Sequence, residues 1–297
     1  MATVVSFINY KGGVGKTTLA VEISASLAYH YKKRVLLADL DPQTNATFYL
    51  MTGEEWDEWA KKHGTLKNVF TSAIAEPPQE FDVRKAIRKE FLHPPRHKDV
   101  IVPLDLLPSH LELMTADMEM AAHFGVKGLE GRKILRSAFE NIKNDYDYII
   151  CDCPPNLNLI TQNAILVSNY LMIVAMPEYL STLGISEIEK AVKRIVVEVN
   201  QYLKGFGEIS GPEIKGIIFN RVQFQKGGNQ YQESIMNRVR EKWPNLVFHN
   251  FISQSVKVVQ SSDPTRSPIA ISGYKADEAY EEQLKKCADE FIKRIEG

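Results

Sequence analysis

The feature that most constrains this chain is a glycine-rich stretch near its N-terminus, residues 11–18, which reads KGGVGKTT. Residues 4–8 before it are mainly β-branched or aromatic and predict a buried strand. Residues 19–28 after it have helical character. A strand, a glycine-rich turn and a helix in this order are the context that a phosphate-binding loop needs. The pattern predicts a nucleotide site on Gly12, Gly13, Val14, Gly15, Lys16, Thr17 and Thr18.

Each residue type in this loop suits that chemistry. Glycines let the backbone fold tightly and point its N–H groups inward, and the new helix adds its positive N-terminal end. Lys16 can reach the β- and γ-phosphates, and the Thr17 hydroxyl can ligate Mg²⁺. A glycine-rich turn without a ligand would leave these lysines and threonines without a reason.

A second lysine, Lys11, opens the loop, and the stretch resembles the deviant Walker A loop of the ParA/MinD family of ATPases. The resemblance implies that the nucleotide is ATP and that the two lysines are both catalytic. Lys16 would act on the nucleotide of its own chain. Lys11 would reach across a homodimer to the partner's nucleotide.

A second candidate site follows the predicted strand 35–39, where Asp39 and Asp41 open the sequence DLDPQTNAT. Ligands of open α/β sheets collect at the carboxyl ends of strands, so the two carboxylates suggest metal and water handling. Aspartates also commonly cap the turn after a strand, and the residues alone leave both interpretations open. The resemblance favours function, because DLDPQTNAT is close to the second motif of the family. It implies that Asp41 positions the attacking water and that Asp39 lies nearer the Mg²⁺.

A third carboxylate, Asp152, ends the apolar stretch 148–152 in the sequence YDYIICDCPP. An apolar strand that ends in aspartate is the Walker B arrangement, whose carboxylate holds Mg²⁺ directly or through water. The neighbours Cys151 and Cys153 invite a metal interpretation, but zinc or a cluster needs four ligands and the chain has no second pair. We therefore expect them to be small core residues, which also argues against an electron-transfer ATPase like the nitrogenase iron protein.

Composition limits the alternatives. The 297 residues are 44% hydrophobic and 25% charged with a net charge of −1, as in ordinary globular proteins. Three cysteines are too few for a disulfide framework, and no apolar run approaches the ~20 residues of a transmembrane helix. The chain enters its first strand without a signal peptide, so we expect a cytoplasmic protein.

Residues 51–100 resemble the family least. They include Trp56 and Trp59 and two basic runs, 84–89 and 93–98. These runs predict either a partner or DNA surface, or a solvated helix face and a polar loop, and the second interpretation is favoured.

Beyond residue 100 the chain alternates predicted strands and helices. An apolar stripe on the long helix after residue 179 predicts core contacts for Ile185, Ile188, Val192, Ile195, Val199 and Tyr202. The predicted strands are 104–109, 171–177, 214–221 and 247–252, and the other predicted helices are 132–142, 230–243 and 280–295. Asn220 ends one of these strands, and the resemblance implies that its amide contacts adenine.

The stretch from Lys215 to Lys275 holds nine Lys or Arg residues and three Asp or Glu residues. Such a local excess on a near-neutral protein is typical of a face that binds phosphates without sequence preference. The residues expected to bind DNA are Lys257, Arg266 and Lys275, which lie in or near predicted loops. The alternative is that these cations are scattered over several faces and only solvated.

The C-terminal helix could either bind a membrane surface or pack on the protein core. MinD-type relatives end in a membrane-seeking amphipathic helix, whose polar face is rich in Lys and Arg. Here acidic and basic residues alternate on the polar side of 280–295, so we expect it to pack on the core.

Taken together, the sequence predicts a single α/β domain over 1–297, a three-layer P-loop fold with a mostly parallel twisted sheet and helices on both faces. The resemblance implies a slow, Mg²⁺-dependent ATPase that dimerises with ATP and binds double-stranded DNA non-specifically on the nucleoid. A ParB-like partner would stimulate hydrolysis during plasmid or chromosome partition. The alternatives are MinD-like positioning at a membrane and positioning of a protein cargo on the nucleoid.

Overall fold

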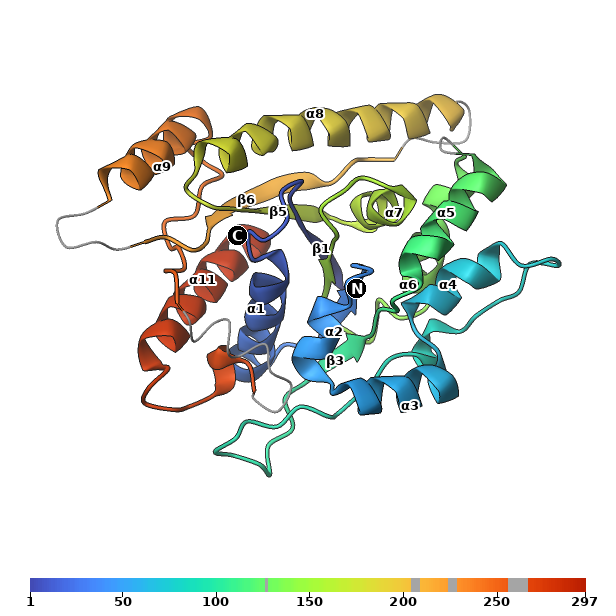
Figure 1. Cartoon of the computed structure of the whole chain (residues 1–297), viewed down its shortest axis with the longest axis horizontal. Helices are drawn as coiled ribbons and strands as arrows, with labels where there is room; N and C mark the ends of the chain where they lie inside the picture. Colours follow the sequence, from blue (N-terminus) through green and yellow to red (C-terminus); the bar gives the residue numbers. More distant parts are fainter. Residues whose placement is uncertain (126–127, 204–208, 224–228, 256–266) are drawn as a thin grey trace.

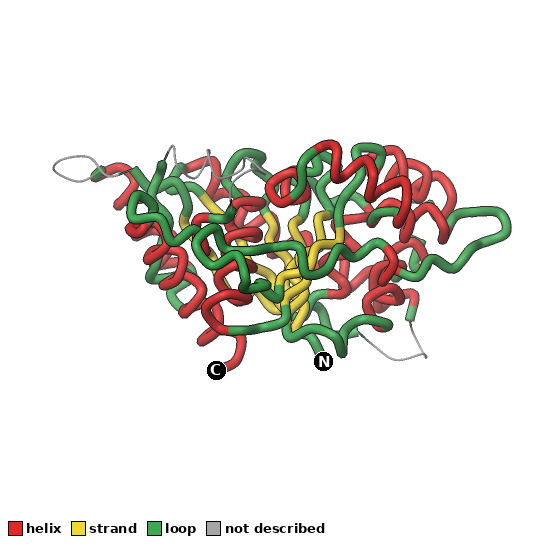
Figure 2. Tube along the Cα trace, turned by 90° about the horizontal axis from the view of Figure 1, so that it is seen from below, coloured by secondary structure: helices red, strands yellow, loops and turns green. Residues whose placement is uncertain are grey.

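The computed structural model describes residues 1–125, 128–203, 209–223, 229–255 and 267–297. A six-stranded sheet in the order β3-β2-β4-β1-β5-β6 forms the centre, and every neighbouring pair is parallel. Figure 2 shows the strands side by side between helices. The strands are β1 (Thr3–Ile8), β2 (Val35–Asp39), β3 (Leu104–Leu107), β4 (Tyr148–Asp152), β5 (Tyr170–Ala175) and β6 (Glu213–Phe219).

Helices cover both faces of this sheet, as the sequence predicted (Figure 1). One core layer lies under α1 (Lys16–Tyr31), α2 (Asn45–Leu50) and α11 (Glu278–Glu296). The opposite layer lies under α4 (Leu66–Ala73), α5 (Leu113–Phe124), α6 (Ile134–Glu140), α7 (Leu159–Val167), α8 (Tyr179–Tyr202) and α9 (Gln230–Lys242). The remaining elements are α3 (Gly53–His63) and the 3-10 turns η1 (Val83–Lys85), η2 (Glu130–Arg132) and η3 (Ile269–Ile271).

The first helix after the glycine-rich loop is buried on nearly all sides. Its residues from Leu19 to Ala28 are inaccessible because the sheet lies against one side and α11 against another. The C-terminal helix uses Leu284, Cys287 and Phe291 for this contact, which confirms that it packs on the core. No helix in the described ranges is both long enough and apolar enough to cross a membrane.

Two expectations about the later elements are wrong. The stretch 247–252 is not a strand of the sheet, since it makes a single isolated bridge, at Val247, and the next one, at Ser253, lies just beyond it. Its middle N–H groups, those of His249 and Asn250, donate to Glu290 of α11 instead of to β6. The apolar stripe of α8 is buried except at its end, where Tyr202 is exposed.

The segment that resembles the family least forms three short helices and a paired loop. Both tryptophans of α3 are used for packing, since Trp56 Nε1 donates to Ser109 O and Trp59 Nε1 donates to Ala86 O. Arg88 pairs with Leu106 of the edge strand β3 in an isolated antiparallel bridge, so the loop after η1 runs beside that strand. In the basic run 84–89, Arg84 forms an ion pair with Asp145 and Arg88 forms one with Glu55.

Candidate nucleotide-binding site

The glycine-rich loop connects the central strand β1 to α1 and has the backbone that its glycines predict. Gly13 and Gly15 have φ angles of 75° and 88°, in the left-handed region that glycine tolerates. A Cβ atom on Gly15 would lie 2.0 Å from Nδ2 of Asn220. The same Nδ2 donates to Val14 O at 2.9 Å, so the residue that follows β6 holds the middle of the loop in place.

The start of the loop is held by a second buried amide, Asn9. Its Nδ2 donates to Val174 O on β5 at 2.6 Å, and its Oδ1 accepts from the Lys11 N–H at 2.9 Å. Two neighbouring strands therefore fix the loop at both ends before any ligand is considered.

Lys16 begins α1 and is 6% exposed. Its Nζ lies 3.4 Å from Lys11 O, which is a long contact for an ammonium group. Burial lowers the pKa of Lys16, while the nearby Asp152 and Asp41 oppose that change. No side chain caps the N-terminus of α1, so the first turn that carries this buried cation also keeps N–H groups that can bind an anion.

The three predicted carboxylates meet at the carboxyl edge of the sheet. In the register of β2 against β4, Asp39 lies opposite Asp152, and β1 with its loop is the other neighbour of β4. Asp41 follows β2 by two residues and is 7% exposed. Parallel pairing thus brings together groups that are far apart in the sequence.

Asp39 and Asp152 differ in how their oxygens are used. Asp39 accepts hydrogen bonds from the Thr47 N–H at 2.8 Å, the Thr47 hydroxyl at 2.7 Å and the Asp41 N–H at 3.1 Å. Both oxygens of Asp152 are buried without a hydrogen-bond partner in the described part of the chain. Burial raises the pKa of Asp39 to about 7, although the Thr47 hydrogen bonds oppose the rise.

Burial also raises the pKa of Asp152, and repulsion from Asp39 adds to the rise. Thr17 and Lys16 oppose it, although no hydrogen bond of good geometry joins Thr17 to Asp152. A buried, uncompensated carboxylate is costly unless a cation accompanies it. Oxygen donors are what Mg²⁺ prefers, so Asp152 and the Thr17 hydroxyl fit a Mg²⁺ ion better than Asp39, whose two oxygens already accept three hydrogen bonds.

Two further side chains shape the site. Asp41 accepts from the Gln43 N–H at 2.9 Å, and its backbone oxygen accepts from the Ser109 hydroxyl at 2.8 Å. Lys11 lies at the rim in an ion pair with Glu178, at 2.6 Å, and both side chains are partly exposed. Sequence reasoning assigned no role to Glu178, Ser109 or Thr47, and their contacts depend on the tertiary fold.

Of the three residues predicted to bind DNA, Lys275 lies within the described part of the chain. Lys257 and Arg266 lie outside the described residues. Lys275 is exposed in the turn before α11. Cys151 and Cys153 are both inaccessible core residues, and burial raises the pKa of the Cys151 thiol to about 12.

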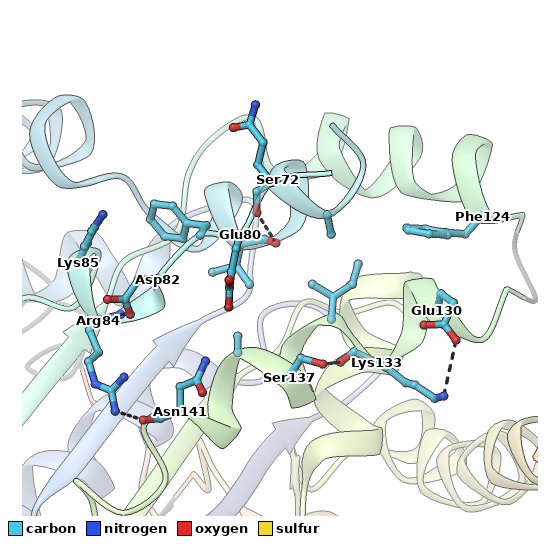
Figure 3. Close-up of a pocket in the computed structure, with 16 residues that line it drawn as sticks. Ser72, Glu80, Asp82, Arg84, Lys85, Phe124, Glu130, Lys133, Ser137 and Asn141 are labelled. Atoms are coloured by element: carbon cyan, nitrogen blue, oxygen red, sulfur yellow. Dashed lines mark hydrogen bonds and ion pairs between the residues drawn. The ribbon is translucent and has the colours of Figure 1, made fainter. Parts of the chain in front are cut away.

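A separate cavity of about 750 Å³ lies between α4, η1 and α6, away from the loop (Figure 3). Its charged groups are largely paired with each other or with the backbone, as in Lys133 with Glu130 and Arg84 with Asn141 O. It includes none of the predicted site residues.

The loop, the buried lysine and the carboxylates at the sheet edge define a phosphate-loop nucleotide-binding protein. A family model described as an AAA domain matches residues 2–205, more than half of the chain. The chain belongs to that family and, within it, to the ParA/MinD-type P-loop partition ATPases.

Relatives of known name support this assignment. The sporulation initiation inhibitor protein Soj of Bacillus subtilis is 29% identical over 262 residues, 88% of each chain. A virulence plasmid ParA family protein of Chlamydia psittaci is 30% identical and covers 86% of this chain and 82% of its own.

Solved structures have the same fold. A plasmid partition protein of Borrelia burgdorferi bound to AMPPNP has a TM-score of 0.68 and 21% identity, and covers 99% of this chain and 100% of its own. Apo McdA from Cyanothece has a TM-score of 0.71 and 20% identity, with 99% and 100% covered.

Proposed function

We propose that this chain is a Mg²⁺-dependent ATPase of the ParA type, in which ATP closes a homodimer that binds double-stranded DNA without sequence preference. A ParB-like partner stimulates hydrolysis and so releases the DNA. The observation that supports the nucleotide chemistry best is the orphaned Asp152 carboxylate beside Thr17 and Lys16.

The chain's own residues have separate roles in this proposal. The backbone of Gly12 to Thr18 and the Lys16 ammonium hold the phosphates of the same chain, and Asp41 orients the attacking water. Mg²⁺ held by Thr17 and Asp152 would neutralise phosphate charge. Lys11 leaves Glu178 and acts on the partner's nucleotide. Contact between Asn220 and adenine stays a prediction. The Asn220 amide nitrogen already donates one hydrogen bond, to Val14 O.

The DNA surface rests on charge. Lys275 is exposed, and Lys257 and Arg266 belong to the same basic part of the sequence. Non-specific binding is an electrostatic attraction to phosphates, so we expect it to weaken steeply with salt. In this proposal the protein works in the cytoplasm and associates with the nucleoid.

Binding to random-sequence duplex DNA tests the proposal, with ATP, a slowly hydrolysed analogue, ADP or no nucleotide across a salt series. We expect binding only with ATP or the analogue. Absence of binding in every state, with ATP still bound, would contradict the DNA surface.

A MinD-like cycle at a membrane is the alternative, and anionic liposomes in the same nucleotide series distinguish it. The packing of Leu284 and Phe291 in the core leaves α11 little free apolar surface for lipid. A protein cargo carried on the nucleoid would use the same ATPase chemistry, and pull-down with the closed dimer as bait would identify the cargo.

A further inference from the structure

A buried carboxyl group in the middle of α1 is not used by the nucleotide site. Glu22 is inaccessible to solvent within the layer that α1 forms with α2 and α11. It accepts hydrogen bonds from the Tyr49 hydroxyl at 2.7 Å, the Ile269 N–H at 3.0 Å and the Ala270 N–H at 2.8 Å. A carboxyl group in such a position is costly unless it is well bonded, so its partners are held tightly.

On one side, Glu22 is connected to the aspartate edge of the sheet through α2. This six-residue helix carries both Thr47, which donates twice to Asp39, and Tyr49, which donates to Glu22. Ser109 N–H also donates to the Thr47 hydroxyl at 2.9 Å. Because Thr47 and Tyr49 are two residues apart on one short helix, a shift of α2 would move both hydroxyls and so change the hydrogen bonds to Asp39 and to Glu22 together.

On the other side, Glu22 holds the start of the segment that carries Lys275. Ile269 and Ala270 begin η3, and the Ser272 hydroxyl donates to Asp277 at 3.0 Å. That hydrogen bond closes the turn in which Lys275 is exposed. The contacts from Asp39 to this turn all lie within the described residues.

We propose that Glu22 is a positioning residue that couples the carboxyl end of β2 to residues 267–277, so that the state of the nucleotide site sets how Lys275 is presented to DNA phosphates. The DNA part rests on the proposed function. Coupling of this kind needs an element with two arrangements that both sites bias, and the proposal assigns that role to α2, which is bonded to Asp39 and to Glu22.

Tyr49→Phe tests the coupling, because it removes only the hydroxyl that joins α2 to Glu22. Tyr31→Phe is the matched control. It also removes one partly buried hydroxyl hydrogen bond of this layer, because the Tyr31 hydroxyl at the C-terminal end of α1 donates to Asp289 of α11. The first readout is hydrogen exchange of residues 267–277 with and without an ATP analogue, which does not depend on DNA. The second is the ratio of DNA affinity with the analogue to that with ADP.

Wild type and Tyr31→Phe should show a change in exchange at 267–277 when the analogue binds, and Tyr49→Phe should lose most of it while its analogue affinity stays unchanged. The affinity ratio should fall about fivefold or more in Tyr49→Phe and keep its wild-type value in Tyr31→Phe. Glu22→Gln should shift both readouts in the same direction, and it replaces Tyr49→Phe if that variant does not fold.

The proposal is overturned if exchange at 267–277 ignores the analogue in wild type, or if Tyr49→Phe behaves like Tyr31→Phe. An exchange response that is lost in Tyr49→Phe, in a protein that binds no DNA, would support the coupling and remove only the DNA surface.

Discussion

The sheet edge around the glycine-rich loop and the segment 51–100 use polar side chains in opposite ways. At the edge, Asn9, Asn220 and Asp39 are buried and bonded to atoms on other elements. In 51–100, Glu55 of the ion pair with Arg88 is exposed, so water competes for its carboxylate. Buried hydrogen-bond networks hold the site residues in place, whereas exposed ion pairs contribute little to stability. Substitutions in the two regions should therefore differ greatly in their effects on ATP binding and on unfolding free energy.

Lys16→Ala should have the largest effect. The variant loses the buried ammonium that faces the loop, so ATP affinity should fall at least about a hundredfold. Isothermal titration with ATP and Mg²⁺ measures this, with circular dichroism as the control for folding. Unchanged affinity would refute the assignment of the loop.

Asp41→Ala should separate binding from hydrolysis. We expect ATP-dependent dimers in sedimentation experiments, with turnover lowered by about two to four orders of magnitude because the water loses its orienting carboxylate. Normal turnover would remove Asp41 from the chemistry.

Gly15→Ala should destabilise the folded protein by about 1–3 kcal/mol, because the new methyl group meets Asn220 in a backbone conformation that alanine resists. Gly12→Ala is the matched control in the same loop, since no atom lies within 4 Å of its Cβ position. Chemical denaturation compares the two, and equal losses would show that Asn220 does not constrain the loop.

Glu55→Gln should have the smallest effect, below about 1 kcal/mol in unfolding free energy, with ATP affinity unchanged. The Arg88 hydrogen bond lowers the pKa of Glu55 below its usual 4.5. The pair therefore contributes above pH 4.5, and the difference between variant and wild type should vanish as the pH falls through the lowered pKa. A difference that grows at low pH would contradict this.

The sequence predicted the parts of the site that are carried by local motifs. The loop follows an apolar strand, Asp39 and Asp152 each end one, and parallel pairing brings such ends together. The hydrogen bonds that hold the loop could not be predicted, because the side chains of Asn9 and Asn220 donate to backbone oxygens 165 and 206 positions away.

Elsewhere the outcome was mixed. The stretch 247–252 has the apolar pattern of a strand, but Glu290 of α11 takes the N–H groups that a strand would pair. In 51–100, Thr52 followed three residues later by Glu55 is a capping box that marks the start of α3. This start signal is local, so the sequence alone contains it.

Mg²⁺ dependence of ATP binding in Asp152→Asn tests the central claim most directly. The substitution removes the charge but keeps the shape of the orphaned carboxylate. Asp105→Asn is the control. Asp105 is a partly buried aspartate on the edge strand β3, and it accepts a hydrogen bond from the Tyr146 hydroxyl.

We expect Mg²⁺ to strengthen ATP binding in wild type and Asp105→Asn but not in Asp152→Asn, while affinity without Mg²⁺ does not fall in either variant. An equal gain from Mg²⁺ in all three proteins would contradict the account of this site.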